Sequence, residues 1–261
     1  MTESVSVHTV ADGVARVTWR AEVVDLGLVD AVARVQPYVD RALAEHGRVE
    51  AWVRPDDVAS QRIATWTGLR REGVMRGAVA EEDRIVFARL AADPPSSEPE
   101  GFRALLNSFL PRKRAISQLL VRDHEHRVLL CQLTYKPDWD LPGGVVEVGE
   151  SPQLAVSREV SEELGLELSA GPLLLTDWLP PWSGWDDALC LVFDGGSHRP
   201  TLLDSIVREK REIRAAEFCT LDQVAERCAE FTARRVAAAL ANLDGGAPAY
   251  VESGRPRQPP H

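Results

Sequence analysis

The chain has 261 residues, 44% of them hydrophobic and 27% charged, which is the composition of a globular protein with one large domain or two ordinary ones. Its formal net charge of −10 argues against nonspecific binding to a nucleic-acid backbone. No apolar run is long enough to span a membrane, and the first residues lack the basic and apolar blocks of a secretory signal. Four cysteines without metal-type spacing predict reduced, mostly buried thiols in a cytoplasmic protein.

Residues 1–92 predict a small α+β unit. A helix is expected over about 30–46, and residues 48–77 and 83–90 resemble the C-terminal half of GNAT acetyltransferases of the ribosomal-protein N-acetylating type. Those enzymes bind the acetyl-CoA pyrophosphate with a glycine-rich turn before a helix, whereas residues 22–29 hold one glycine and two acids, and Asp57 replaces the usual Asn. We therefore expect a truncated GNAT-like module without a catalytic role. A bifunctional acetyltransferase and hydrolase is the alternative.

The rest of the chain predicts a second α/β domain. Residues 93–101 contain three prolines and two serines and predict a linker, and residues 245–261 predict a flexible tail. Between them, residues 102–244 show alternating strand and helix patterns, which favour a mixed sheet flanked by helices. The expected strands are 115–122, 127–133, 139–141, 173–179, 188–193 and 216–220, with a loop over 194–200 and a helix from Leu221.

A helix is predicted over residues 152–164. Ser151 suits the N-cap, Pro152 suits the first helical position, and Gly165 suits the left-handed residue that ends a helix. An apolar stripe with a spacing of four residues must face a core. It consists of Val156, Val160 and Leu164.

The same helix carries an acidic face. Glu159, Glu162 and Glu163 are three and four residues apart, so their carboxylates converge. A hard divalent cation, Mg²⁺ or Mn²⁺, offsets the repulsion between such groups. Arg158 can hold a neighbouring carboxylate in a bidentate geometry, and Glu150 is the expected partner.

Residues 144–166 fit one pattern throughout, and by that pattern the chain resembles the Nudix hydrolases. The matching positions are Gly144, Glu150, Arg158, Glu159, Val160, Glu162, Glu163, Gly165 and Leu166. The resemblance implies an αβα sandwich with a mixed sheet. It also implies metal ligation by Glu159, Glu163 and Glu162, and by the backbone carbonyl of Gly143 or Gly144.

The general base is left open between a box glutamate and a distal one, as in different branches of that family. Glu162 and Glu163 are the candidates within the box. Glu209, Glu212 and Glu217 are the distal candidates, and we favour Glu217 because it begins a late strand beside an aromatic residue. With Arg158, these residues form the predicted catalytic set.

Aromatic residues on both approaches to the box are candidates for stacking a base, and the alternative is that they pack their loops onto the sheet. Trp182 lies in a Pro/Gly-rich loop with two further indoles, and Tyr135 and Trp139 precede the glycine turn. With Gly143 and Glu150 they form the predicted substrate contacts. The resemblance implies Mg²⁺-dependent hydrolysis of a nucleoside diphosphate linked to another group, either a nucleotide sugar such as ADP-ribose or a nucleoside triphosphate. A non-catalytic module that senses a nucleotide derivative is the alternative, and the sequence leaves a homodimer open.

Overall fold

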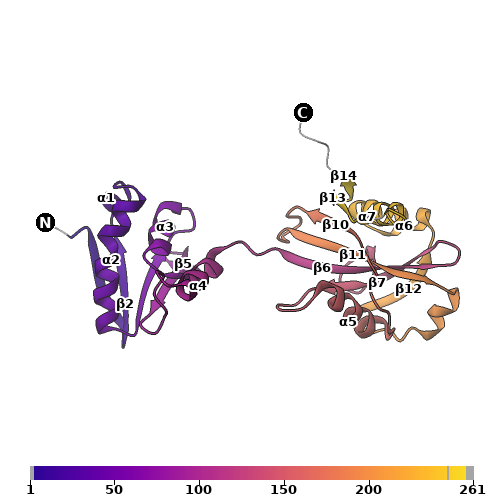
Figure 1. The fold of residues 1–261 in the computed structure, drawn as a ribbon, viewed down its shortest axis with the longest axis horizontal. Coiled ribbons are helices and arrows are strands. Elements are labelled where there is room, and N and C mark those ends of the chain that lie inside the picture. Colours follow the sequence, from indigo (N-terminus) through magenta and orange to yellow (C-terminus); the bar gives the residue numbers. More distant parts are fainter. Residues whose placement is uncertain (1–2, 246, 257–261) are drawn as a thin grey trace. The chain divides into compact units, whose positions relative to one another are not determined.

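The computed structural model describes residues 3–245 and 247–256. It divides the chain into two compact units, Met1–Pro111 and Arg112–His261, each with its own sheet (Figure 1). The four cysteines are buried and free, which confirms the prediction of buried thiols. A search of the described helices finds none that is both long and apolar enough to cross a membrane.

The N-terminal unit is a five-stranded sheet in the order β1-β2-β3-β5-β4. Only the β2–β3 pair is parallel. One face of the sheet packs against α2 and α3, and Val35, Val49 and Phe87 lie in this core. The elements are β1 (Val5–Ala11), β2 (Val14–Trp19), α1 (Ala21–Val24), α2 (Leu28–Glu45), β3 (Arg48–Val53), α3 (Val58–Trp66), β4 (Arg70–Val79), β5 (Glu82–Leu90) and α4 (Pro99–Phe109).

The segment predicted to be a linker, residues 93–101, is instead part of the N-terminal unit. Asp93 forms an ion pair of 3.0 Å with Arg70, and Pro99 starts the helix α4, which contacts β4. A Cβ on Gly101 would lie 2.1 Å from the carbonyl oxygen of Pro95, so the chain is closely folded there. The prolines serve a turn and a helix start, and the boundary between the units falls between Pro111 and Arg112.

The C-terminal unit is built on a nine-stranded mixed sheet. Its main path is β12-β7-β6-β11-β10-β13-β14, while β8 pairs with β7 and β9 pairs with β6. The strands are β6 (Arg114–Asp123), β7 (Val128–Leu133), β8 (Trp139–Asp140), β9 (Gly143–Val145), β10 (Leu173–Leu179), β11 (Ala188–His198), β12 (Ile213–Cys219), β13 (Ala249–Glu252) and β14 (Arg255–Pro256). The helices are α5 (Pro152–Leu164), η1 (Pro200–Ser205), α6 (Leu221–Arg227) and α7 (Glu230–Ala241).

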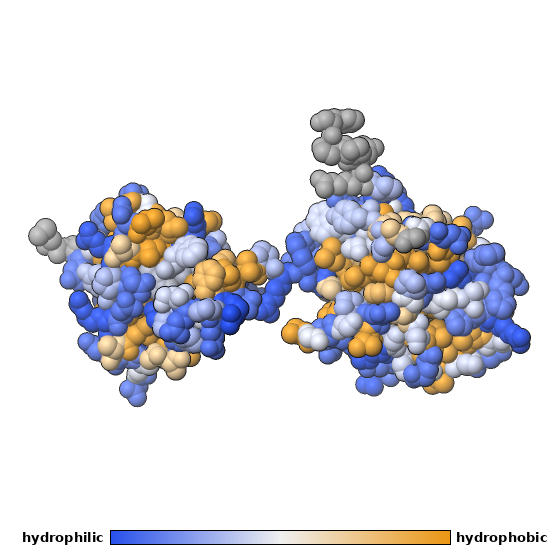
Figure 2. All heavy atoms as spheres, viewed as in Figure 1, coloured by the Kyte–Doolittle hydropathy of each residue, from blue (hydrophilic) through white to orange (hydrophobic). Residues whose placement is uncertain are grey.

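The helices cover both faces of this sheet, as the prediction of a sandwich requires (Figure 1). Alternate residues of β7 point to opposite sides: Leu129 packs with Val160 of α5, while Leu130 packs with Val236 of α7. Figure 2 shows hydrophobic residues gathered in the middle of the visible face of this unit. The sheet therefore separates the box helix from α6 and α7.

The box helix matches its predicted bounds. Helix α5 runs from Pro152 to Leu164, and Gly165 ends it in the left-handed conformation at φ 65°. Ser151 occupies the N-cap, but its side chain makes no capping bond, and its carbonyl oxygen instead accepts from the N–H of Ala155 at 2.8 Å.

Two predictions about the edges of this unit are wrong. Strand β11 continues to His198, through the predicted loop over 194–200, because its last residues still pair with β6. The predicted flexible tail contains β13, which pairs in parallel with β10, and β14. Val251 of β13 is buried, and the buried Asp177 of β10 accepts a hydrogen bond from the Gly254 N–H at 3.0 Å. Residues 246 and 257–261 of the predicted tail lie outside the described residues.

Candidate active site

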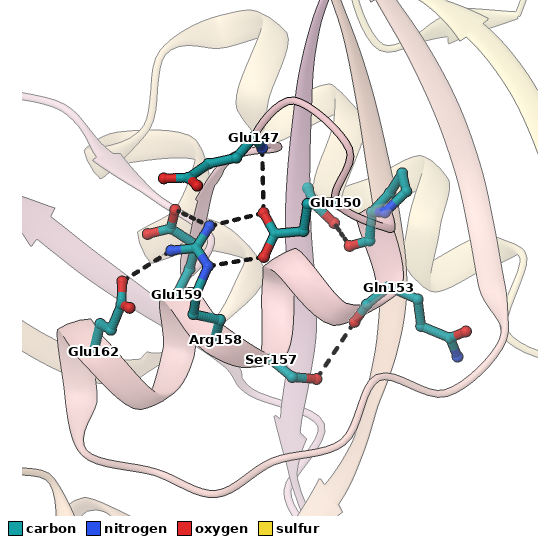
Figure 3. Close-up of polar contacts among 9 residues, drawn as sticks. Glu147, Glu150, Gln153, Ser157, Arg158, Glu159 and Glu162 are labelled. Carbon is teal, nitrogen blue, oxygen red and sulfur yellow. Dashed lines mark hydrogen bonds and ion pairs between the residues drawn. The ribbon is translucent and has the colours of Figure 1, made fainter.

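Arg158 organises the acidic face of the box helix. Its Nε and Nη2 donate to the two carboxylate oxygens of Glu150, at 2.8 and 3.0 Å, as predicted (Figure 3). Its Nη1 donates to Glu162 at 2.9 Å, and its Nη2 lies 3.1 Å from Glu159. The hydrogen bonds from Arg158 lower the pKa of Glu150 below its ordinary value. Three box carboxylates, those of Glu150, Glu159 and Glu162, are therefore held around one guanidinium.

Glu159 and Glu163 lie against the glycine turn that precedes the helix. A Cβ on Gly144 would lie 2.5–2.7 Å from the carboxylate atoms of Glu159, so a side chain there would displace this carboxylate. The N–H of Gly143 donates to Oε2 of Glu163 at 3.4 Å. Gly143 has a φ of 133°, and a Cβ there would meet the carbonyl oxygen of Ser117 at 2.2 Å. The glycine turn therefore packs closely against both Glu159 of α5 and the backbone of β6.

Burial makes the charge on these two carboxylates costly. The pKa of Glu163 is raised to about 8, chiefly by burial, with contributions from the charges of Glu159, Glu212 and Asp140, while the hydrogen bond from Gly143 opposes the shift. The pKa of Glu159 is also raised, first by burial and then by Glu162 and Glu212, although Arg158 opposes the shift. The site therefore concentrates negative charge that no nearby cation fully balances.

This donor set fits a hard divalent cation at Glu159 and Glu163. Both are carboxylates beside backbone of the glycine turn, and a cation would offset their mutual repulsion. Glu162 is drawn instead toward Arg158 and is largely exposed, so the three carboxylates do not converge as the spacing predicted. Across residues 3–245 and 247–256, no three His, Cys, Asp or Glu side chains are gathered as a metal site.

The structure does not bring Glu217 to the box. In β12 it pairs with Leu130, which faces α6 and α7 rather than α5, and its carboxylate forms an ion pair of 2.6 Å with Arg227 of α6. The prediction for Glu217 was wrong because successive side chains of a strand point to opposite faces of the sheet, so a shift of one residue moves a side chain to the other face.

Of the distal candidates, Glu212 lies on the same side of the sheet as the box helix α5. Its charge acts on both Glu159 and Glu163. The loop that carries it is fixed beside α5, because the Glu209 N–H donates to the carbonyl oxygen of Glu163 at 2.9 Å. Glu162, Glu209 and Glu212 line one hollow together with Arg211.

A cavity of about 580 Å³ opens beside the glycine turn, with Gly143 and Gly144 in its wall. Tyr135 and Trp182, two of the predicted aromatic contacts, line this cavity and are largely exposed. Trp182 meets Phe231 of α7 edge to face, with ring centroids 5.8 Å apart. An apolar cavity with exposed aromatic rings suits a planar ligand.

Trp139 is not in this cavity. It is buried in the core beneath α6, with the guanidinium of Arg227 4.7 Å from its ring centre, so its predicted role as a substrate contact is not supported by its position. Three further residues that line the cavity were not predicted from the sequence: Gln118, Lys136 and Arg235. A signal existed for Arg235, because it lies four residues after Phe231 on an otherwise apolar helix face.

The fold, the box and the cavity together define a Nudix domain. The family model described as NUDIX domain matches residues 111–240. A MutT-like protein of Streptomyces ambofaciens is 32% identical over 134 residues, which cover 51% of this chain and 79% of that protein. The chain therefore belongs to the Nudix hydrolase family.

Two further similarities are more limited. A protein of Mycobacterium tuberculosis (strain ATCC 25618 / H37Rv) named putative 8-oxo-dGTP diphosphatase 2 is 46% identical over 46 residues, 16% of this chain and 33% of that protein. The crystal structure of a MutT protein from Methanosarcina mazei Go1 has 21% identity and a TM-score of 0.42, and covers 50% of this chain and 96% of its own. The family match lies after residue 110, so the GNAT-like character of residues 1–92 stays a prediction.

Proposed function

We propose that this chain hydrolyses the diphosphate bond of a nucleoside diphosphate linked to another group, at a site made by Glu159, Glu163 and the Gly143–Gly144 turn. The observation that carries the proposal is the position of the buried carboxylate of Glu163 and the partly buried carboxylate of Glu159 against that turn, at the wall of a cavity with exposed aromatic rings. All of these residues belong to the C-terminal unit, so we assign the chemistry to that unit alone.

Glu159 and Glu163 would hold Mg²⁺ or Mn²⁺ together with a carbonyl oxygen of the turn. Such an ion supplies charge neutralisation on the diphosphate oxygens and lowers the pKa of water. The raised pKa values of both glutamates fit this role, since burial and neighbouring acidic groups disfavour their charged forms and a bound cation would offset both effects.

The protein's own side chains do the remaining work. Arg158 fixes Glu150, Glu159 and Glu162 by hydrogen bonds and ion pairs, and so positions the acidic face of the helix. Glu212 faces Glu159 and Glu163 from the opposite loop, and we assign it removal of the proton from the attacking water. Tyr135 and Trp182 pack against the nucleoside in the cavity and exclude water from it.

The substrate is either a nucleoside triphosphate or a nucleotide sugar. The name of the mycobacterial relative, putative 8-oxo-dGTP diphosphatase 2, favours an oxidised nucleoside triphosphate, but the matching segment covers a third of that protein. A panel of nucleoside triphosphates and nucleotide sugars, with products identified by mass spectrometry, separates the two classes. A triphosphate gives a nucleoside monophosphate and pyrophosphate, and a nucleotide sugar gives a nucleoside monophosphate and a sugar phosphate.

The panel also tests the catalytic proposal itself. Hydrolysis must depend on added Mg²⁺ or Mn²⁺ and must disappear in Glu163→Gln. If every panel member binds but none is cleaved, the chain is a module that senses nucleotide derivatives, and the proposed hydrolysis is wrong.

A further inference from the structure

The floor of the cavity is crossed by a continuous chain of polar side chains. Arg235 donates from Nε to Asp177 at 2.8 Å and from Nη1 to Oε1 of Gln118 at 3.0 Å. The Nε2 of Gln118 donates to Asp140 at 2.8 Å, and Lys136 donates to the other oxygen of Asp140 at 2.7 Å. Four of these residues line the cavity, and we call them the polar floor: Gln118, Lys136, Asp140 and Arg235.

One donor of this floor has no partner within the described residues. Arg235 is 1% exposed, yet its Nη2 is buried without a hydrogen bond. Arg114, which lines the same cavity, also has a buried Nε without a partner. Unpaired buried donors are costly and rare in folded proteins, so a guanidinium left in this state beside a cavity points to a ligand that completes it.

The acceptors of the floor are already in use. Both carboxylate oxygens of Asp140 and both of Asp177 accept hydrogen bonds, and the Gln118 carbonyl oxygen accepts from Arg235. The remaining carboxylate of the lining, Asp186, is exposed. The polar group of the floor that is left without any partner is therefore a donor, the Nη2 of Arg235.

The charges of the floor are also balanced. Arg235 is paired with Asp177, and Lys136 with Asp140. An additional anion would unbalance this arrangement, whereas a neutral carbonyl oxygen would accept a hydrogen bond without changing it. The geometry thus favours a neutral acceptor at this end of the cavity.

We propose that Arg235 binds the keto oxygen at C6 of a purine or C4 of a pyrimidine, so that the chain selects guanine, hypoxanthine, oxidised guanine and uracil over adenine and cytosine, which carry an amino group at that position. A guanidinium commonly pairs with a keto oxygen in this way. The exocyclic amino group of adenine or cytosine presents donor hydrogens to the unpartnered Nη2 of Arg235, which is itself a donor. This inference rests on the proposed function, because it takes the occupant of the cavity to be a nucleotide.

Matched pairs of ligands test the proposal without any change to the protein. Inosine and adenosine monophosphates differ chiefly in a keto and an amino group at one ring position, and uridine and cytidine monophosphates differ likewise. Calorimetry on the full chain should show each keto ligand binding at least about 10-fold more tightly than its amino partner. Hydrolysis of the corresponding triphosphates should show the same order in kcat/KM. Equal binding within both pairs overturns the proposal. In that case water, and not a base, accepts the hydrogen bond from the Nη2 of Arg235.

A variant locates the preference. Arg235→Lys keeps the positive charge beside Asp177 but lacks the planar fork, and it should reduce the keto preference to about threefold or less. Arg227→Lys, which lies outside the cavity, should keep the parental preference. A preserved preference in a folded Arg235→Lys protein overturns the assignment to Arg235. If this variant unfolds, the ligand pairs on the parent protein still decide the selectivity.

The two proposals fail in different ways. Keto-selective binding without cleavage of any triphosphate or nucleotide sugar overturns the hydrolysis and leaves the base selectivity standing. Cleavage at equal rates for keto and amino partners overturns the selectivity and leaves the hydrolysis standing.

Discussion

Glu163 and Gly143 are joined by a hydrogen bond of 3.4 Å from backbone N–H to carboxylate, across 20 positions of the chain. This contact fixes the C-terminal end of the box helix against the turn that precedes it. It places the most strongly perturbed carboxylate of the site next to the backbone that lines the cavity.

Glu163→Gln should abolish hydrolysis while the protein stays folded. The amide keeps the size of the side chain and removes a buried charge, so thermal unfolding should not occur at a lower temperature than in the parent. Loss of a metal-binding carboxylate should lower kcat by at least about 100-fold. Glu167→Gln, at an exposed position just after the same helix, is the matched control and should keep parental activity. Substantial hydrolysis by the Glu163 variant would place the metal elsewhere.

Glu212→Gln and Glu217→Gln should behave differently, because the two residues lie on opposite faces of the sheet. We expect a fall in kcat of about 100-fold or more for Glu212→Gln, as for removal of a general base. Glu217→Gln only breaks an ion pair with Arg227, and its activity should stay within about twofold of the parent. Steady-state kinetics on the best panel substrate measures both. The opposite ranking would restore Glu217 as the base.

Arg158 and Glu150 should act as one unit. Arg158→Lys cannot reproduce the two parallel bonds to Glu150, and Glu150→Gln removes their acceptor charge. Each change should lower kcat about 10- to 100-fold, the range expected for residues that orient metal ligands. The double variant should be no worse than the more damaged single variant. Additive losses would show that the two residues contribute independently.

Gly254→Ala should destabilise the C-terminal unit beyond the ordinary cost of a left-handed backbone. The added Cβ would meet the Cβ of Arg234 at 2.6 Å and the backbone nitrogen of Arg235 at 2.7 Å, at a φ of 72°. Gly149→Ala is the matched control in the same unit, since Gly149 has a φ of 83° and open space around it. Chemical denaturation should show a loss of about 1–2 kcal/mol for Gly149→Ala and clearly more for Gly254→Ala. Equal losses would mean that the β13–β14 turn is loosely held.

Asp123 should make the free energy of unfolding depend on pH in the acidic range. Burial tends to raise the pKa of Asp123, but hydrogen bonds from the backbone and side chain of Arg127 and from the Glu125 N–H outweigh it, so the pKa is lowered. The stabilisation from this carboxylate is therefore complete above its unfolded pKa, near 3.8, and is lost as the pH falls through the lower folded value.

Asp123→Asn should lower the free energy of unfolding at pH 7 by about 1–3 kcal/mol, since the bonds from Arg127 lose a charged acceptor. Its deficit should shrink as the pH falls below about 4. Denaturation at a series of pH values checks this, and a deficit that stays constant with pH would show that the charge of Asp123 plays no part.

The box helix could be predicted from sequence to the residue, because its start, end and apolar stripe are all local signals. Pro152, Gly165 and the spacing of Val156, Val160 and Leu164 depend on nothing distant in the chain. The pairing of Arg158 with Glu150 followed from the same local geometry.

The errors arose where long-range pairing decides. Whether Glu217 faces α5 or α6 depends on the register of β12 on β7, which no local pattern around Glu217 reveals. The strand β13 is four residues long within a Gly- and Pro-rich segment, and it exists because β10 offers an edge for it to pair with. Pro99 looked like part of a linker, but prolines are as common at the first turn of helices as they are in linkers.

Gln118 has a consequence for how the selectivity of this protein can change over evolution. Its backbone pairs with Gly143 of the glycine turn, while its side chain accepts a hydrogen bond from Arg235 of the polar floor. Arg235 is also held by Asp177, which in turn accepts a hydrogen bond from the Gly254 N–H. Among the hydrogen bonds of the described residues, neither Asp177 nor Gly254 contacts a box carboxylate. With the proposed base selectivity, substitutions around α7 and β14 would change which base is accepted and leave the proposed hydrolytic site unchanged. Gln118 is the exception, because a substitution there would affect both Gly143 and Arg235.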